Sequence, residues 1–266
     1  MLDKELDSGE KGSRKKRLRG VYLLPNLLTS ASLFGGFYSI VASLDGNYQV
    51  AAMAIFVSSV FDLLDGRIAR LTGTTSKFGV EYDSLSDLVA FGLAPGILIF
   101  TWALRGFGRY GWLAAFLYVV CATLRLARFN VQITTVESKR FNGLPVPAAA
   151  LFVASTVLLF FYLHHGDKTR HVLVLLQVYM LAFLMVSNIK FYSFKELNLK
   201  RRMPFSLLVA LILIFIVVAA EPQLMLFILT FGYVLSGPVT MLIDKQRNRF
   251  PYVVMEDEED SHTKNE

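Results

Sequence analysis

Residues 62–87 read DLLDGRIARLTGTTSKFGVEYDSLSD, and this stretch carries four aspartates within a chain that is otherwise rich in apolar residues. Asp62 and Asp65 are spaced i, i+3, and Asp83 and Asp87 are spaced i, i+4. On helices, both spacings place the two carboxylates of a pair on one face. A carboxylate inside a membrane is costly and marks a functional site by default. The four aspartates therefore predict a cationic partner among them.

The whole chain has the composition of a membrane protein. Of its 266 residues, 54% are hydrophobic and only 18% are charged. Runs of about 20 mainly apolar residues recur along it, which is the length of a helix that crosses the hydrocarbon core. The first run follows a polar segment and lacks a small-residue cleavage site, so we do not expect a cleaved signal peptide. Cys121 is the only cysteine, which excludes an intrachain disulfide and a cysteine metal cluster.

Hydropathy predicts an all-α, polytopic membrane protein of eight transmembrane helices. The spans are expected at residues 22–44, 48–70, 83–104, 109–129, 146–164, 171–189, 204–220 and 223–243. We expect three regions along the chain: a basic segment at 1–19, one membrane domain at 20–245 and a charged tail at 246–266. The first aspartate pair would then end the second span, and the second pair would begin the third.

Basic residues are distributed unevenly between the predicted loops. Eight spans put both termini on one side, and that side collects most of the Lys and Arg residues, including the N-terminal cluster from Lys11 to Arg19. Because positive loops favour the cytoplasmic side, we expect both termini, the 71–82 loop and the aspartates at the cytoplasmic face of the inner membrane. A site there is open to the cytosol and to the lipid at once. The N-terminal cluster can also contact anionic headgroups of membrane lipids.

The aspartate stretch holds the ligand types that hard divalent cations prefer. Carboxylates without a nearby His or Cys suit Mg²⁺ or Mn²⁺, and their number makes two ions plausible, which can clamp a phosphate. Gly66 leaves the helix surface open to a bulky ligand. Arg70, one turn further on, can donate two hydrogen bonds to a phosphate from its guanidinium, and Ser76 adds a hydroxyl. Together these residues indicate a phosphorylated, nucleotide-like ligand.

Bare carboxylates would also suit the ion pathway of a cation-coupled transporter, and the full spacing separates the two hypotheses. The stretch fits D-x2-D-G-x2-A-R-x8-G-x3-D-x3-D at every fixed position. This pattern resembles the signature of the CDP-alcohol phosphatidyltransferase family, without a departure. A transporter has no need of the glycine and arginine at these positions. We therefore favour an enzyme over a transporter.

The resemblance implies a particular chemistry. Members of this family are helical membrane enzymes that transfer a phosphatidyl or similar group from a CDP-linked donor to an alcohol and release CMP. By position, the resemblance implies that the four aspartates hold two divalent ions and that Asp87 is also the general base. It further implies donor contacts from Pro25, Asn26, Gly66, Arg70 and Ser76. A homodimer is what the family suggests, and no nucleic-acid partner is expected.

Three further segments bear on the acceptor alcohol. CATLRLARFN (121–130), FNGLPVPAAA (141–150) and LMVSNIKFYSFK (184–195) resemble the phosphatidylserine synthase branch of the family. This branch implies CDP-diacylglycerol as donor and L-serine as acceptor. Serine brings a carboxylate that needs a cation, so Arg125, Arg128 and Asn130 are the expected acceptor contacts. Glycerol 3-phosphate or inositol phosphate is the alternative acceptor, since the same arginines can provide a phosphate pocket.

Overall fold

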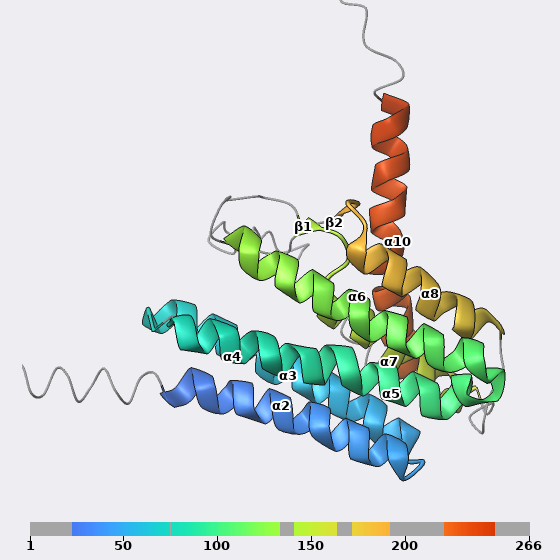
Figure 1. The fold of residues 1–266 in the computed structure, drawn as a ribbon, viewed down its shortest axis with the longest axis horizontal. Coiled ribbons are helices and arrows are strands. Elements are labelled where there is room, and N and C mark those ends of the chain that lie inside the picture. Colours follow the sequence, from blue (N-terminus) through green and yellow to red (C-terminus); the bar gives the residue numbers. More distant parts are fainter. Residues whose placement is uncertain (1–22, 75, 134–140, 164–171, 192–220, 248–266) are drawn as a thin grey trace, which may run out of the picture.

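The structure is a computed structural model, and it describes residues 23–74, 76–133, 141–163, 172–191 and 221–247. In these ranges the chain forms a helical bundle with one short β-pair (Figure 1). The main helices are α2 (Leu23–Leu44), α3 (Tyr48–Thr72), α4 (Lys77–Asp87), α5 (Ala94–Ile99), α6 (Arg109–Ile133), α7 (Val146–Tyr162), α8 (Val172–Val186) and α10 (Pro222–Arg247).

Apolar helices lie at seven of the eight predicted spans. Five described helices are long and apolar enough to cross a membrane, and α7 and α8 are apolar but shorter. The polytopic helical class is thereby confirmed. The predicted span at 204–220, the basic segment at 1–19 and the tail beyond residue 247 lie outside the described residues. One small departure from an all-α chain is a pair of two-residue strands, β1 (Phe141–Asn142) and β2 (Lys190–Phe191).

The predicted start of the third span at residue 83 was wrong. Helical structure begins at Lys77 and continues to Phe107. The helix starts early because Ser76 caps it, accepting a hydrogen bond from the Gly79 backbone N–H at 3.0 Å. Gly73, at a φ of 62°, ends α3. The aspartate pairs therefore lie inside two antiparallel helices, and Asp62 and Asp87 are each about 15 Å along the helix axis from the connecting turn.

The long third helix is not a uniform α-helix. It contains two π-helical turns, η1 (Leu88–Leu93) and η2 (Phe100–Leu104), and ends in a 3₁₀ turn, η3 (Arg105–Phe107). The first π turn follows Asp87 directly. α2 crosses this turn so closely that a Cβ on Gly36 would lie 2.5 Å from the Ala90 Cα. The backbone that carries the second aspartate pair is therefore held against α2.

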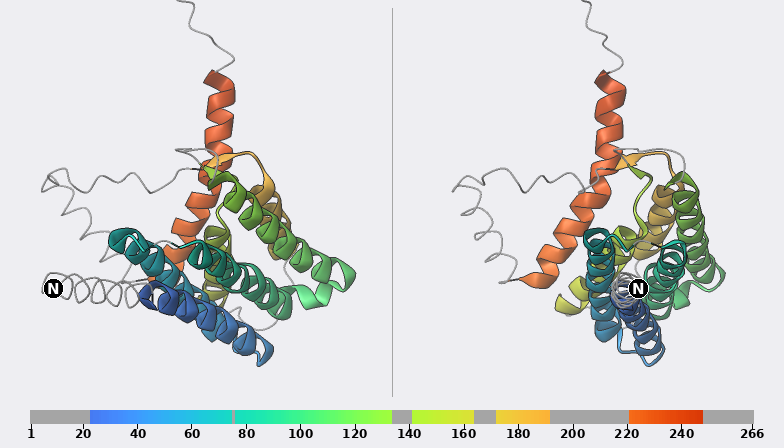
Figure 2. Two further views of the ribbon diagram at one scale, coloured as in Figure 1. Left: turned by 60° about the vertical axis from the view of Figure 1, so that its left-hand side comes forward. Right: turned by 90° about the vertical axis from the view of Figure 1, so that its left-hand side faces the viewer.

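The most buried helix is α7, which packs against α3, α10 and η1 in the middle of the bundle (Figure 2). Polar contacts inside the apolar region add specific links between helices. Ser155 and Thr230 share a hydrogen bond at 2.8 Å between α7 and α10, and Gln177 of α8 donates to the Thr156 hydroxyl at 2.8 Å. Such contacts and close packing hold helices together in lipid, where the hydrophobic effect between helices is weak.

The β-pair ties the start of α7 to the end of α8. Phe141 pairs with Phe191 in the antiparallel ladder. The Gly143 N–H then donates to the Ile189 carbonyl at 2.7 Å, and the Leu144 N–H donates to the Leu184 carbonyl at 3.0 Å. The two segments that resemble the phosphatidylserine synthase branch at 141–150 and 184–195 thus meet in space. Pro145 and Pro147 lie at the start of α7, where the fixed φ of proline suits the first turn of a helix.

Gly143→Ala is predicted to destabilise the protein strongly. Gly143 has a φ of 82°, and an added Cβ would lie 2.5 Å from the Met185 carbonyl oxygen. Backbone strain and the clash together should cost about 3 kcal/mol or more. Gly46→Ala is the matched control, because Gly46 has a φ of 81° but open space at its Cβ, so only strain of about 1–2 kcal/mol is expected. Thermal unfolding in detergent measures both variants, and equal losses would contradict the close packing.

Candidate active site

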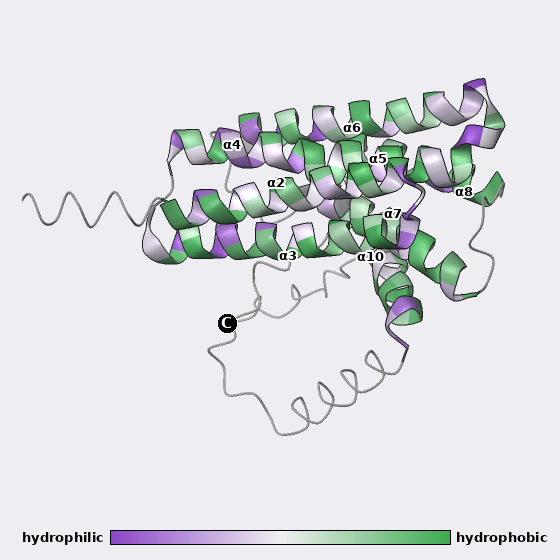
Figure 3. Ribbon diagram, turned by 90° about the horizontal axis from the view of Figure 1, so that it is seen from below, coloured by the Kyte–Doolittle hydropathy of each residue, from purple (hydrophilic) through white to green (hydrophobic). Residues whose placement is uncertain are grey.

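Three carboxylates meet between α3 and α4. One oxygen each from Asp62, Asp83 and Asp87 can be chosen so that all three lie within 4.8 Å of one another. Asp62 comes from α3, whereas Asp83 and Asp87 come from successive turns of α4. Figure 3 shows hydrophilic residues on these two helices among otherwise hydrophobic surroundings. The i, i+4 spacing of the second pair thus does bring both of its carboxylates to one site.

Asp65 lies beside this group and not within it. Its side chain is only 4% exposed and faces Thr29 of α2. Oδ2 of Asp65 and Oδ1 of Asp83 are buried and have no hydrogen-bond partner among the described residues. Buried acceptors that lack a partner are costly, so these two oxygens are suited to a ligand that the chain itself does not supply.

The carboxylate oxygens of this site fit a hard divalent cation as its ligands. All of its atoms are carboxylate oxygens, which Mg²⁺ and Mn²⁺ prefer, and the crowding of three like charges favours a cation among them. The buried oxygens without a partner point to the same conclusion. Asp62, Asp83 and Asp87 could hold such an ion together, whereas a role for Asp65 as a ligand stays a prediction.

Hydrogen bonds from α2 fix the position of α4. The Ser86 hydroxyl donates to the Thr29 carbonyl at 3.1 Å, and the Ser30 and Tyr82 hydroxyls share a bond at 2.8 Å. Both bonds come from the turns of α4 that also carry Asp83 and Asp87. The helix that bears the second aspartate pair is therefore tied to α2 close to both carboxylates.

The residues expected to contact the donor fall into two groups. Asn26 and Ser76 converge at the start of α4, where a Cβ on Gly79 would lie 3.6 Å from the Asn26 Oδ1 and 3.2 Å from the Ser76 Oγ. On α3, a Cβ on Gly66 would meet nothing within 4 Å, so the helix surface there is open. Arg70 is exposed one turn further along. Both groups border the hairpin of α3 and α4.

Pro25 differs from the other donor candidates because its ring is buried. Its carbonyl accepts a hydrogen bond from the Thr29 hydroxyl at 3.0 Å, one turn along α2. These contacts make Pro25 part of the frame of the site.

The three candidate acceptor residues on α6 have different surroundings. Asn130 exchanges hydrogen bonds with Ser84 of α4 at 2.9 and 3.1 Å, next to Asp83. Arg128 donates to the Val186 carbonyl at 3.2 Å at the end of α8. Arg125 is buried, at 7% exposure, and lies near Tyr233 of α10 and near Arg128. Asn130 therefore touches the aspartate helix, whereas the arginines face α8 and α10.

Sequence reasoning did not single out three neighbours of the site. Thr29 lies beside Asp65, Asn188 accepts from Arg128 at 3.4 Å, and Tyr233 lies beside Arg125. Asn188 falls within LMVSNIKFYSFK, so a signal for it was present in the sequence. Thr29 and Tyr233 look like ordinary residues of an apolar helix, and only the packing of α2 and α10 reveals them.

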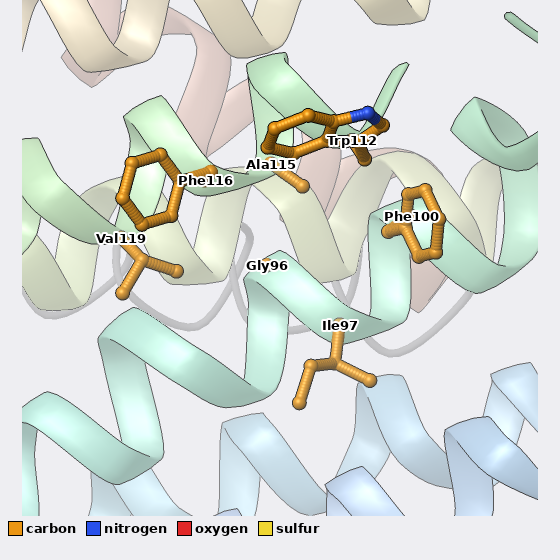
Figure 4. Close-up of a pocket in the computed structure, with 7 residues that line it drawn as sticks. All are labelled: Gly96, Ile97, Phe100, Trp112, Ala115, Phe116 and Val119. Atoms are coloured by element: carbon orange, nitrogen blue, oxygen red, sulfur yellow. The ribbon is translucent and has the colours of Figure 1, made fainter. Parts of the chain in front are cut away.

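An apolar groove lies between α5 and α6, away from the aspartates (Figure 4). It has a volume of about 180 Å³ and is lined by Gly96, Ile97, Phe100, Trp112, Ala115, Phe116 and Val119. Figure 4 shows the rings of Trp112, Phe116 and Phe100 around it. Its lining offers no carboxylate or basic group for a diphosphate, so it is not an alternative to the aspartate site.

The family can now be stated from comparison with known proteins. Residues 22–187 match the model of the CDP-alcohol phosphatidyltransferase family. The chain belongs to this family. The matched range contains the whole α3–α4 hairpin and all four aspartates.

Individual relatives are also similar over most of their length. The chain is 40% identical to a CDP-diacylglycerol–serine O-phosphatidyltransferase of Helicobacter pylori, over 74% of this chain and 83% of the relative. It is 34% identical to the protein of the same name from Bacillus subtilis, over 65% of this chain and 92% of the relative. It is 41% identical to an archaetidylserine synthase of Methanothermobacter thermautotrophicus, over 55% of this chain and 63% of the relative.

Asp83→Asn is predicted to remove stabilisation by divalent cations. The wild-type protein in detergent should unfold at a higher temperature with Mn²⁺ than with a chelator, since a ligand that binds only the folded state stabilises it, by about 2.7 kcal/mol at a hundredfold excess over Kd. In the variant this difference should largely vanish, and with chelator present the variant should be at least as stable as wild type because like-charge repulsion is relieved. Asp45→Asn, in the exposed turn after α2, is the control and should keep the Mn²⁺ effect. An undiminished rise in unfolding temperature with Mn²⁺ in Asp83→Asn would contradict a cation site that includes Asp83.

Proposed function

We propose that this protein is a membrane enzyme that transfers the phosphatidyl group of CDP-diacylglycerol to the hydroxyl of L-serine, giving phosphatidylserine and CMP. The observation that carries the proposal is the meeting of Asp62, Asp83 and Asp87 between α3 and α4. It occurs within the family signature, in a chain 40% identical to a relative named for this reaction over 83% of that relative's length.

The aspartates would hold Mg²⁺ or Mn²⁺, and we propose two ions, with Asp65 completing the set. Such ions supply positive charge that offsets the donor diphosphate and eases the departure of CMP. The chain's own contribution is to keep the carboxylates crowded before the donor arrives, through the bonds from α2 to Ser86 and Tyr82. Preorganised ligands of this kind need little rearrangement during the reaction.

The donor is proposed to lie along the open face of the α3–α4 hairpin. Gly66 leaves room for the nucleotide to approach the helix backbone, and the exposed Arg70 can reach a phosphate oxygen. Asn26 and Ser76 add polar groups at the start of α4. The diacylglycerol chains would remain in the surrounding lipid, which fits a site inside membrane-spanning helices.

Asp87 is proposed as the general base. The serine hydroxyl attacks the β-phosphorus, which carries the diacylglycerol oxygen, and the bond between this phosphorus and the oxygen bridging to the α-phosphorus breaks. The hydroxyl proton passes to the Asp87 carboxylate as the new bond forms, and CMP leaves with the bridging oxygen. A carboxylate is a weak base, so its task is to accept the proton during the attack and not before it.

The acceptor is proposed to bind between α4 and α6. Asn130 already contacts Ser84 beside Asp83, and the buried Arg125 is the cation that would attract the serine carboxylate. Arg128 would support this region by holding the end of α8. By the distribution of basic residues, we infer that this side of the bundle faces the cytosol, where serine is available.

An acceptor assay tests the proposal directly. Purified protein with CDP-diacylglycerol and Mn²⁺ should release CMP when L-serine is added, and should do so at least tenfold more slowly with glycerol 3-phosphate or inositol phosphate. The reason is that a relative 40% identical to this chain is named for serine as acceptor, and the buried Arg125 can offer one cation to the serine carboxylate. Rapid CMP release with a phosphorylated acceptor, and none with serine, would show that the phosphorylated compound is the acceptor. Absence of CMP release with every acceptor would contradict the proposed phosphatidyltransferase activity.

Asp87→Asn should reduce serine-dependent CMP release by at least a thousandfold, because the amide neither accepts the proton nor binds a cation as a carboxylate does. Binding of the CDP-linked donor should fall far less, since Gly66, Arg70 and Asn26 remain. Radiolabelled donor binding and CMP release measure the two effects separately. Asp45→Asn is again the control and should retain wild-type turnover. A variant at Asp87 with most of its activity would sink the base assignment.

A further inference from the structure

We propose that Tyr118 is a positioning residue for the aspartate site: its hydroxyl holds the π-helical turn that follows Asp87 and so sets the direction of the α4 carboxylates. The proposal rests on the proposed function only in that these carboxylates hold a divalent cation. Tyr118 lies on α6 and belongs to no motif of the sequence. Its hydroxyl bonds a backbone carbonyl of η1 and not an aspartate.

The π turn η1 has a local cause in the sequence. Pro95 lies four residues after Phe91, and a proline has no N–H to donate to the carbonyl four residues before it. In an α-helix its ring would also clash with that carbonyl. The π turn relieves this conflict, and the Ala94 N–H bonds the Val89 carbonyl five residues back. The Phe91 carbonyl is left without its α-helical partner.

Tyr118 supplies the hydrogen-bond donor that Pro95 lacks. Its hydroxyl donates to the Phe91 carbonyl oxygen at 3.2 Å, and its side chain is completely buried. A buried phenol needs a partner for its hydroxyl, and a buried carbonyl needs a donor, so the two satisfy each other in a region without water. Next to this bond, a Cβ on Gly92 would lie 3.5 Å from the Ala122 Cβ of α6. The turn is therefore fixed against α6 at two successive positions.

The turn η1 also packs against α2. A Cβ on Gly36 would lie 2.5 Å from the Ala90 Cα, so α2 leaves the turn no room to move toward it. α2 and Tyr118 therefore both contact η1, at the neighbouring residues Ala90 and Phe91. Ala90 and Phe91 are completely buried between them.

The turn matters to the site because it sets the rotation of α4 about its axis relative to the helix that follows. A π turn takes about one residue more than an α turn, and one residue corresponds to about 100° around the helix. The helix beyond η1 is anchored, since α5 packs against α2, α6 and α7. If η1 relaxed to an α turn, Asp83 and Asp87 would rotate away from Asp62. The bond from Tyr118 thus acts on the carboxylates through the backbone.

The test is Mn²⁺ binding by the full-length protein in detergent, measured from the paramagnetic resonance signal of free Mn²⁺. Tyr118→Phe removes the hydroxyl alone and keeps the ring in its place. The variant is expected to bind Mn²⁺ at least tenfold more weakly than wild type. Backbone amides of residues 88–96 are expected to exchange with deuterium faster. Unchanged affinity for Mn²⁺ in a folded variant would overturn the proposal.

Tyr48→Phe is the matched control. The Tyr48 hydroxyl bonds the Thr101 carbonyl at 3.3 Å, in the second π turn of the same helix but remote from the aspartates. This variant should keep wild-type affinity for Mn²⁺. Equal weakening in both variants would show a general loosening of the helix and would also overturn the proposal.

The double variant Tyr118→Phe with Pro95→Ala provides a second route if Tyr118→Phe alone does not fold. Alanine returns an N–H to the helix, so the Phe91 carbonyl has a partner without the Tyr118 hydroxyl, while the π turn has lost both its cause and its support. This variant should also bind Mn²⁺ at least tenfold more weakly, and wild-type affinity would contradict the proposal. A wild-type protein that binds Mn²⁺ yet releases no CMP would refute the proposed function while these comparisons still decide the role of Tyr118. A wild-type protein that binds no Mn²⁺ would overturn both.

Discussion

The constraint on which the structure depends is the cost of crowding carboxylates inside an apolar bundle. Three of them lie within 4.8 Å of one another, and Asp65 is buried beside them. Such a cluster is held together only by the surrounding frame and by a cation that it is suited to bind. The frame consists of the α3–α4 hairpin, closed by Gly73 and capped by Ser76, and of the bonds from α2. The carboxylate cluster and the helices that hold it, α2 to α4, thus follow one another directly in the sequence.

The proposed acceptor side is assembled from segments that are far apart in the chain. β1 and β2 join the residues before α7 to those after α8, and Gly143 allows the two backbones to approach. Arg128 connects α6 to the same end of α8, while Asn130 connects α6 to the aspartate helix. This region therefore forms only when α6, α7 and α8 have packed.

Sequence reasoning was reliable where a pattern is local. Apolar length located the described helices, and the i, i+4 spacing placed Asp83 and Asp87 together. It failed at the start of the third helix, because KFGVEY at 77–82 is too polar to count as a span although Ser76 caps a helix there. It also did not anticipate that Arg128 holds the end of α8. A flanking basic residue looks the same in sequence whether it faces solvent or a carbonyl from a distant helix.

The sequence by itself determined the membrane class, the family and the identity of the aspartates, because hydropathy and fixed spacing along one helix are properties of neighbouring residues. The tertiary structure alone decided which carboxylates meet, with Asp62 joining Asp83 and Asp87 while Asp65 turns toward Thr29. It also brought the Tyr118 hydroxyl to the Phe91 carbonyl, in the π turn that follows Asp87. The physical reason is that a helix fixes which residues share a face, whereas the packing of helices distant in sequence fixes what that face meets.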